Sequence, residues 1–163
     1  MTGIDGEKAV LQEFLGYQRA TAMAIVDGLG EVALHTTVLP SGWTPIGLIE
    51  HLADAERHWF QAVLTGTLSP RPWDDGCPSF VTPRSSAEVL AFYREQCSLS
   101  DRLIAETPLD AAPVGKHEDE RLAAQTTDLR RIILHMIEET ARHAGHLDAA
   151  RELIDGRTGL GPR

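Results

Sequence analysis

The chain has 163 residues and a formal net charge of −9, from 15 basic and 24 acidic residues. This length fits a single domain and suffices to bury a hydrophobic core. An acidic surface repels phosphate backbones, so we expect no nucleic-acid partner. No apolar run approaches the roughly 20 residues of a membrane span, and Cys77 and Cys97 form no paired motif. These features predict a cytoplasmic protein with free thiols and no membrane partner.

The first predicted helix runs from about Glu7 to Leu29, where Gly28 and Gly30 end it. Its apolar residues recur at helical spacing, which predicts one buried face. That face consists of Val10, Leu11, Phe14, Leu15, Tyr17, Ala22 and Ile25. The following segment, His35 to Leu39, is β-prone but too short to predict a strand.

The second predicted helix begins at Thr44-Pro45, a favourable N-cap before a favourable first residue, and ends at Gly66. Its apolar face consists of Leu48, Leu52, Ala55, Trp59, Ala62 and Val63. A loop with four prolines follows, from Thr67 to Pro83. Because such long loops are uncommon in compact domains, we interpret it as a crossover between the two ends of a helical bundle.

The third predicted helix begins at Ser85, whose capping-box partner Glu88 follows three residues later, and it ends before Pro108. Its buried side consists of Val89, Leu90, Phe92, Tyr93, Cys97, Leu99 and Ile104. A polar loop from Pro108 to about Thr126 separates it from the last helix.

The fourth predicted helix runs from about Asp128 to Asp155 and ends at Gly156. Its apolar face includes Leu129, Ile132, Ile133, Met136, Ile137, Leu147, Ala150 and Leu153. Four amphipathic helices predict an all-α fold, a four-helix bundle. We expect residues 1–156 to form this domain and residues 157–163 to form a C-terminal tail.

Three potential metal ligands share one stripe of the fourth helix. At about 100° per residue, Glu139, His143 and His146 fall within roughly 60° of one another, and His135 lies one turn earlier. An i, i+4 pair such as Glu139 and His143 brings two donor atoms close enough to share one ion. A solvated polar face is the commoner reason for such a pattern, so a metal site needs a further ligand from a neighbouring helix.

The second helix offers that ligand in His51, at the border of its apolar face, with His58 two turns further along. Asp54 is a candidate to orient an imidazole by a hydrogen bond. Neither helix contains the Glu-x-x-His pattern of di-iron bundles, and the His-Glu-x-x-His pattern of zincins is absent. No nucleophile elbow indicates a serine hydrolase. The residues therefore favour one divalent ion between these two helices.

These residues resemble those of the DinB-like superfamily, which includes bacillithiol S-transferases and mycothiol-dependent maleylpyruvate isomerases. Three stretches carry the resemblance, which is to the actinobacterial-type branch: WTP at 43–45, IEHLADAERHW at 49–59 and HMIEETARHAGH at 135–146. It covers nearly the whole chain, up to Gly156. It implies a four-helix bundle with a long crossover between helices two and three.

The resemblance also implies the ligand set. One divalent ion, zinc or nickel, would be held by His51, Glu139 and His143. Many members of the superfamily have histidine at the position of Glu139, whereas the maleylpyruvate isomerase-type members have glutamate there. This departure leaves His146 as an alternative or additional ligand.

The function implied by the resemblance is a thiol-dependent S-transferase or isomerase. The metal would activate a low-molecular-weight thiol of the mycothiol type towards an electrophile. Arg57 and Arg142 are candidates to bind an anionic group. The alternatives are a metal-dependent hydrolase, with Glu139 or His146 as base, and a non-catalytic metal-binding stress protein. A homodimer is expected from the same resemblance.

Overall fold

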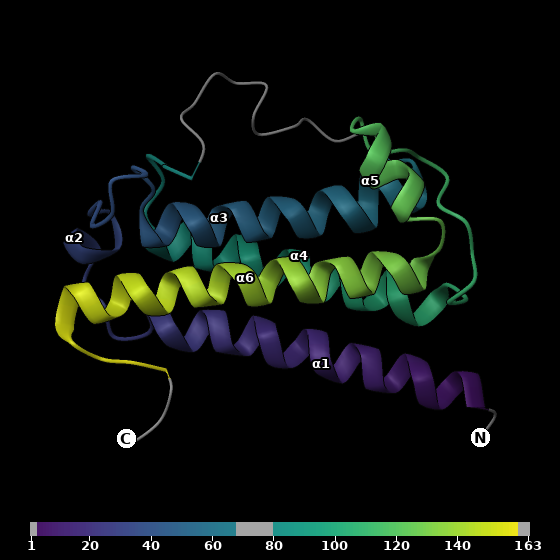
Figure 1. Cartoon of the computed structure of the whole chain (residues 1–163), viewed down its shortest axis with the longest axis horizontal. Coiled ribbons are helices and arrows are strands. Elements are labelled where there is room, and N and C mark those ends of the chain that lie inside the picture. Colours follow the sequence, from purple (N-terminus) through teal and green to yellow (C-terminus); the bar gives the residue numbers. More distant parts are fainter. Residues whose placement is uncertain (1–2, 68–79, 160–163) are drawn as a thin grey trace.

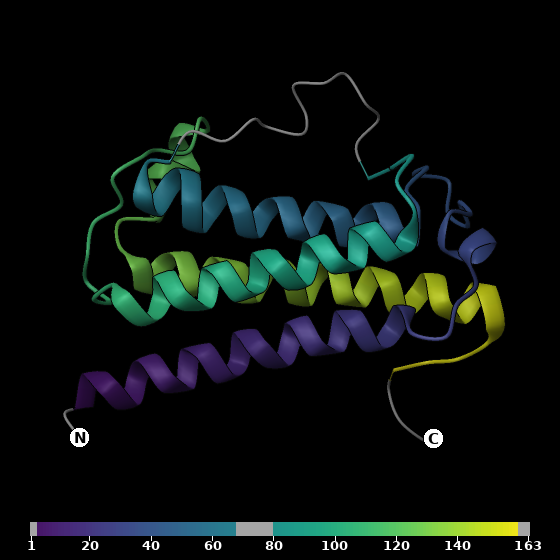
Figure 2. The ribbon, with the colours of Figure 1, turned by 180° about the vertical axis from the view of Figure 1, so that it is seen from behind.

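Four long helices lie side by side in the computed structural model, which describes residues 3–67 and 80–159 (Figures 1 and 2). They are α1 (Gly3–Val26), α3 (Pro45–Glu56) with its continuation η1 (Arg57–Leu64), α4 (Ser86–Glu106) and α6 (Leu129–Asp155). The described residues contain no strand, and none of their helices is long and apolar enough to cross a membrane. The predicted all-α four-helix bundle is confirmed.

The directions of the helices confirm the predicted crossover. Helices α1 and α6 run one way along the bundle, whereas α3 and α4 run the other way (Figures 1 and 2). Because α3 and α4 are successive long helices and run parallel, the chain between them has to return along the length of the bundle. Most of that connection, residues 68–79 with Cys77, lies outside the described residues.

Two short helices occur in segments predicted as irregular. Helix α2 (Glu31–Leu34) has 4 residues and α5 (Glu120–Gln125) has 6. Neither is long enough to show an apolar stripe in the sequence. Helix α5 has a local start signal, because the Asp119 carboxylate accepts hydrogen bonds from the backbone N–H groups of Arg121 (2.9 Å) and Leu122 (3.0 Å).

The predicted caps of the long helices are confirmed. The Thr44 hydroxyl accepts a hydrogen bond from the backbone N–H of Gly47 (3.1 Å) at the start of α3. Ser85 and Glu88 form the capping box of α4. Helix α6 ends at Gly156, whose φ of 78° lies in the left-handed region that favours glycine.

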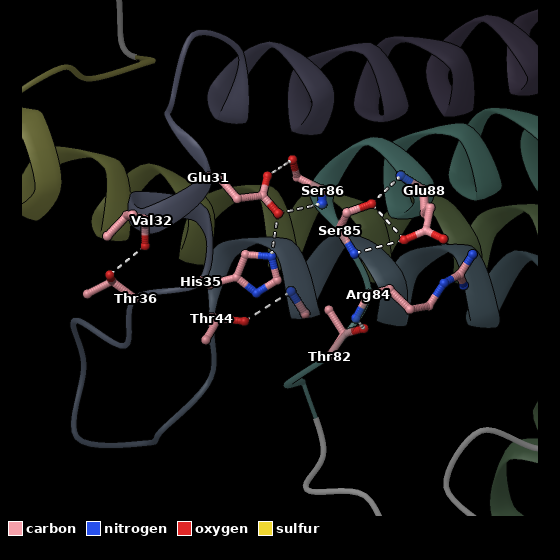
Figure 3. Close-up of polar contacts among 11 residues, drawn as sticks. Glu31, Val32, His35, Thr36, Thr44, Thr82, Arg84, Ser85, Ser86 and Glu88 are labelled. Carbon is pink, nitrogen blue, oxygen red and sulfur yellow. Dashed lines mark hydrogen bonds and ion pairs between the residues drawn. The ribbon is translucent and has the colours of Figure 1, made fainter.

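The start of α4 is also bound to α2 (Figure 3). The Glu31 carboxylate accepts hydrogen bonds from the hydroxyl and the backbone N–H of Ser86, the latter at 3.0 Å. It also lies 3.1 Å from Nε2 of His35. These contacts fix α2 against the bundle just before the chain enters α3.

The buried face of α1 differs from the predicted one. Val10, Phe14 and Tyr17 are 51%, 56% and 68% exposed, whereas Leu15 and Ala22 are fully buried. The inward stripe instead includes Arg19, which is 7% exposed. The sequence contained two apolar stripes on this helix, and a charged residue lay on the one that is buried. Leu153 of α6, also predicted in the core, is 61% exposed.

Arg19 joins three helices in the interior. Its Nε and Nη2 atoms donate to both carboxylate oxygens of Glu56 on α3, each at 2.7 Å, and its Nη1 donates to Asp101 on α4 at 2.7 Å. Glu56 is fully buried. A two-pronged contact of this kind satisfies a buried guanidinium group, which explains how Arg19 occupies a core position.

Cys97 is a free, half-buried cysteine on α4, which agrees with its interpretation as a small core residue. Burial raises the pKa of its thiol to about 12, and the nearby Glu56 carboxylate acts in the same direction. A thiol with so high a pKa is protonated at neutral pH and is a poor nucleophile.

Candidate metal centre

His51 of α3 meets Glu139 and His143 of α6 across the bundle. The Glu139 Oε1 atom lies 3.2 Å from His51 Nε2 and 2.9 Å from His143 Nε2. The three donor atoms all lie within 4.8 Å of one another. The structure thus brings together residues 51 and 139, which are 88 positions apart in the sequence.

The helices place these side chains at the rim of the core. Leu52, next to His51, is fully buried, and Ala144, next to His143, is 5% exposed. The side chains of His51, Glu139 and His143 are 26%, 18% and 11% exposed. The imidazoles are therefore held by packing. The three side chains of His51, Glu139 and His143 form the candidate metal group, which keeps access to solvent.

Glu139 is ionised throughout the neutral range. Its hydrogen bonds to His143 and then to His51 hold the pKa of its carboxyl well below the usual range, and this outweighs the opposing effect of burial. Arg142 Nη1 lies 3.8 Å from Glu139 Oε2, although its shorter ion pair is with Glu138 at 2.7 Å. A metal ligand has to be deprotonated, and Glu139 meets this condition.

The donor set fits a divalent transition-metal ion. Two ligand atoms at zinc–ligand bond lengths in a tetrahedral arrangement lie about 3.3 Å apart. The two distances from Glu139 Oε1, 3.2 Å and 2.9 Å, are close to this value. Two imidazoles with one carboxylate also make up a known catalytic zinc ligand set that leaves a further position open.

His146 lies beside the group and not within it. Its Nδ1 atom is 3.5 Å from Nδ1 of His143, and its side chain is exposed. Its ring is 6.3 Å from that of Trp43, centroid to centroid. The role of His146 as a ligand stays a prediction.

His58 and His135 lie in a second cluster of rings, together with Trp59 from the predicted apolar face and His117, which the sequence did not indicate. The Trp59 ring stacks on the His117 ring, with 4.9 Å between the centroids and 17° between the planes. The Trp59 centroid is also 4.5 Å from that of His135, and the His58 centroid is 5.0 Å from that of His117. Burial lowers the pKa of both His117 and His135. His117 was missed because it lies in a loop without periodicity.

The second long helix changes to wider π-helical winding at Arg57, where η1 begins. His58 lies on this part of the helix, with its ring beside those of Trp59 and His117. Asp54, predicted to orient an imidazole, instead accepts a hydrogen bond from Arg57 (3.0 Å). Arg57 also lies over the ring of Phe92, 5.6 Å from its centroid, and so is engaged between α3 and α4.

A cavity of about 420 Å³ lies between α5 and α6, beside the metal group. Its lining residues are Asp119, Arg121, Leu122, Gln125, His135, Glu138, Glu139 and Arg142. Glu139 belongs to both the cavity and the metal group, so a molecule in the cavity would adjoin this one residue of the group. Arg142, predicted as an anion-binding candidate, lies in the wall.

Phe80 contacts the metal group from the end of the crossover. Its ring centroid is 4.5 Å from that of His51, in an edge-on arrangement, and 5.9 Å from that of His143. No sequence pattern indicated this residue, because it lies in a proline-rich segment without helical spacing.

Comparison with known proteins supports the resemblance seen in the sequence. A family model described as mycothiol S-transferase matches residues 10–156, which include every residue of the metal group. The comparison with curated proteins gave no match. The matching family is DinB-like, as the three sequence stretches predicted. The chain therefore belongs to the mycothiol S-transferase family.

Proposed function

We propose that the protein is a metal-dependent S-transferase that joins a thiol of the mycothiol type to an electrophile. His51, Glu139 and His143 would hold one divalent ion, zinc or nickel. The observation that carries this proposal is the position of Glu139 Oε1 between two imidazole nitrogens, at 3.2 Å and 2.9 Å. Membership of the mycothiol S-transferase family supports the choice of thiol.

A divalent ion with three protein ligands has an open position, where it would favour the deprotonated form of a thiol. Glu139 supplies one negative charge to offset the ion, and its low pKa keeps that charge at neutral pH. In the overall reaction a sulfur–carbon bond forms, the leaving group departs with its electron pair, and the thiol proton passes to solvent. The partly exposed side chains of His51 and Glu139 give solvent that access.

The cavity beside Glu139 suits the polar body of a substrate. Arg121, Gln125 and Arg142 offer hydrogen-bond donors, while Asp119 and Glu138 offer acceptors. Leu122 is the one aliphatic residue in the lining. We propose that a hydroxyl-rich or amide-bearing thiol binds here, with its sulfur directed towards the metal group.

Elemental analysis of the purified protein tests the metal site. We expect one bound ion per chain in the wild type and loss of the ion in both His51→Ala and His143→Ala. His35→Ala is the matched control, because the His35 ring pairs with Glu31 on α2 and is not a member of the group. Full metal content in His51→Ala or His143→Ala would contradict the proposed ligands.

An assay of zinc-loaded protein with mycothiol and a chromogenic electrophile tests the reaction. We expect conjugation that requires both the thiol and the metal. Turnover of an ester or amide without thiol would favour a metal-dependent hydrolase instead. Retained metal with no turnover of any substrate would favour the non-catalytic alternative.

A further inference from the structure

Phe80 has an unusual backbone conformation. Its φ of 64° is positive, and no other non-glycine residue in the described part of the chain shares this feature. The left-handed region is unfavourable for a bulky side chain because Cβ approaches the carbonyl oxygen. Such a conformation persists only where the surrounding structure imposes it, and it often marks a functional site.

The start of α3 imposes this conformation. The backbone N–H of Thr44 donates to the carbonyl oxygen of Phe80 at 3.0 Å. Gly47 allows the same carbonyl to approach the first turn of α3, because a Cβ atom on Gly47 would lie only 2.0 Å from that oxygen. The backbone of Phe80 is therefore seated against the helix that carries His51.

The seated backbone directs the phenyl ring onto the metal group. The ring lies edge-on to His51, with 4.5 Å between centroids and 67° between planes, and it also neighbours His143 at 5.9 Å. A phenyl ring offers no donor atom to a cation and no hydrogen-bond partner to water. Where it covers the group, it leaves no polar contact for solvent.

We propose that Phe80 is a specificity-determining wall of the metal centre, which keeps water from one side of the bound ion and thereby preserves a low coordination number. This inference rests on the metal site proposed above and not on the thiol chemistry. With that side closed, an incoming ligand approaches where Glu139 borders the polar cavity. A single position then stays available for the substrate atom.

Visible absorption of the cobalt(II)-loaded protein tests the proposal without any assay of activity. Four-coordinate cobalt(II) absorbs far more strongly than six-coordinate cobalt(II), so the intensity reports coordination geometry. At full loading we expect Phe80→Ala to absorb severalfold less than the wild type, because water enters the uncovered side. Phe80→Leu keeps an apolar cover and should retain most of the intensity.

Phe80→Gly distinguishes the effect of the missing ring from the effect of a changed backbone conformation. Glycine adopts a positive φ without strain, so this variant should unfold at a higher temperature than Phe80→Ala. Its cobalt spectrum should nevertheless match that of Phe80→Ala, because both variants lack the ring. Phe14→Ala is the matched control, since Phe14 is 56% exposed on α1 and its loss should leave the spectrum unchanged.

Two spectra would overturn the proposal. A wild-type spectrum from Phe80→Ala at full loading would show that the ring does not limit coordination. A wild-type spectrum from Phe80→Gly alone would assign the effect to the backbone turn. Failure of the wild type itself to bind cobalt would overturn the proposed metal site, and this inference with it.

Discussion

At the level of single residues, Glu139 links the two helices of the candidate centre. One of its oxygens lies within hydrogen-bond distance of an imidazole on α3 and an imidazole on α6. The low pKa of its carboxyl means that this contribution to stability is fully present at neutral pH. It is lost as the pH falls through the acid range, where the unfolded chain takes up a proton first.

His146 is predicted as an alternative or additional ligand, and its contact with the far nitrogen of His143 gives it a second possible role, that of supporting His143. If it only supports His143, His146→Ala should keep a bound ion. Loss of such a supporting contact typically weakens metal affinity by about 10- to 100-fold. Competition with a chromophoric chelator measures the affinity. Complete loss of the ion, as expected for His143→Ala, would instead make His146 a ligand.

Asp54 gives a prediction of pH dependence. Burial raises the pKa of its carboxyl to about 6, although Arg57 acts in the opposite direction. The folded protein therefore holds this proton more tightly than the unfolded chain does. Ionisation of Asp54 reduces stability as the pH rises from about 4 to about 6, by an amount on the order of 2 to 3 kcal/mol.

Asp54→Asn removes this ionisation, and its amide oxygen still accepts from Arg57. The free energy of unfolding of the variant minus that of the wild type should therefore be larger at pH 7 than at pH 4, by that amount. Urea unfolding of both proteins at the two pH values gives the difference and cancels the effect of Glu139. An identical stability difference at both pH values would contradict the prediction.

At the level of elements, the packing of α1 depends on a charged residue. The apolar spacing of α1 predicted a helix correctly, but it included the exposed residues Val10, Phe14 and Tyr17 in the buried face. Periodicity identifies stripes and does not show which stripe another helix covers. Arg19 lies on the buried stripe because Glu56, on a different helix, satisfies its guanidinium group.

Glu56→Gln tests this interhelix pair. The change leaves the buried Arg19 without its full counter-charge, so we expect a loss of about 3 to 5 kcal/mol in the free energy of unfolding. Glu7→Gln is the control, since Glu7 pairs with Arg130 at the surface and should change stability little. Chemical denaturation measures both. A double-mutant cycle checks the coupling. If the double variant Arg19→Met, Glu56→Met loses as much free energy of unfolding as the single variants Arg19→Met and Glu56→Met lose in sum, the two residues are not coupled.

At the level of the whole molecule, the candidate metal site joins α3 and α6, two helices that are separated in the sequence by the crossover and by α4. An ion bound by α3 and α6 favours the folded state over the unfolded chain. At a free metal concentration 100 times the dissociation constant, this adds about 2.7 kcal/mol. We therefore expect a chelator to lower the unfolding temperature of the wild type, as scanning calorimetry would show. His51→Ala should show no such shift, and an equal shift in both proteins would contradict the site.

The homodimer expected from the resemblance stays a prediction. Sedimentation velocity over a range of protein concentrations checks it. A single species with the mass of one chain, 17.8 kDa, at all concentrations would contradict it.

The sequence by itself determined the features that depend on near neighbours in the chain. These are the four long helices, the caps at Thr44 and Ser85, and the i, i+4 pair of Glu139 and His143. Each follows from spacing or hydrogen bonds within a few residues. The position of His51 at the border of its apolar face made it a candidate third ligand, and the resemblance, which rests on the same local stretches, implied the same residue.

The tertiary structure decided what depends on distant residues. It selected the buried stripe of α1, stacked His117 on Trp59 and seated Phe80 on His51. Local spacing leaves the rotation of a helix about its axis and the path of a loop undetermined. Close packing between elements fixes both, so these contacts arise only when the whole chain is folded.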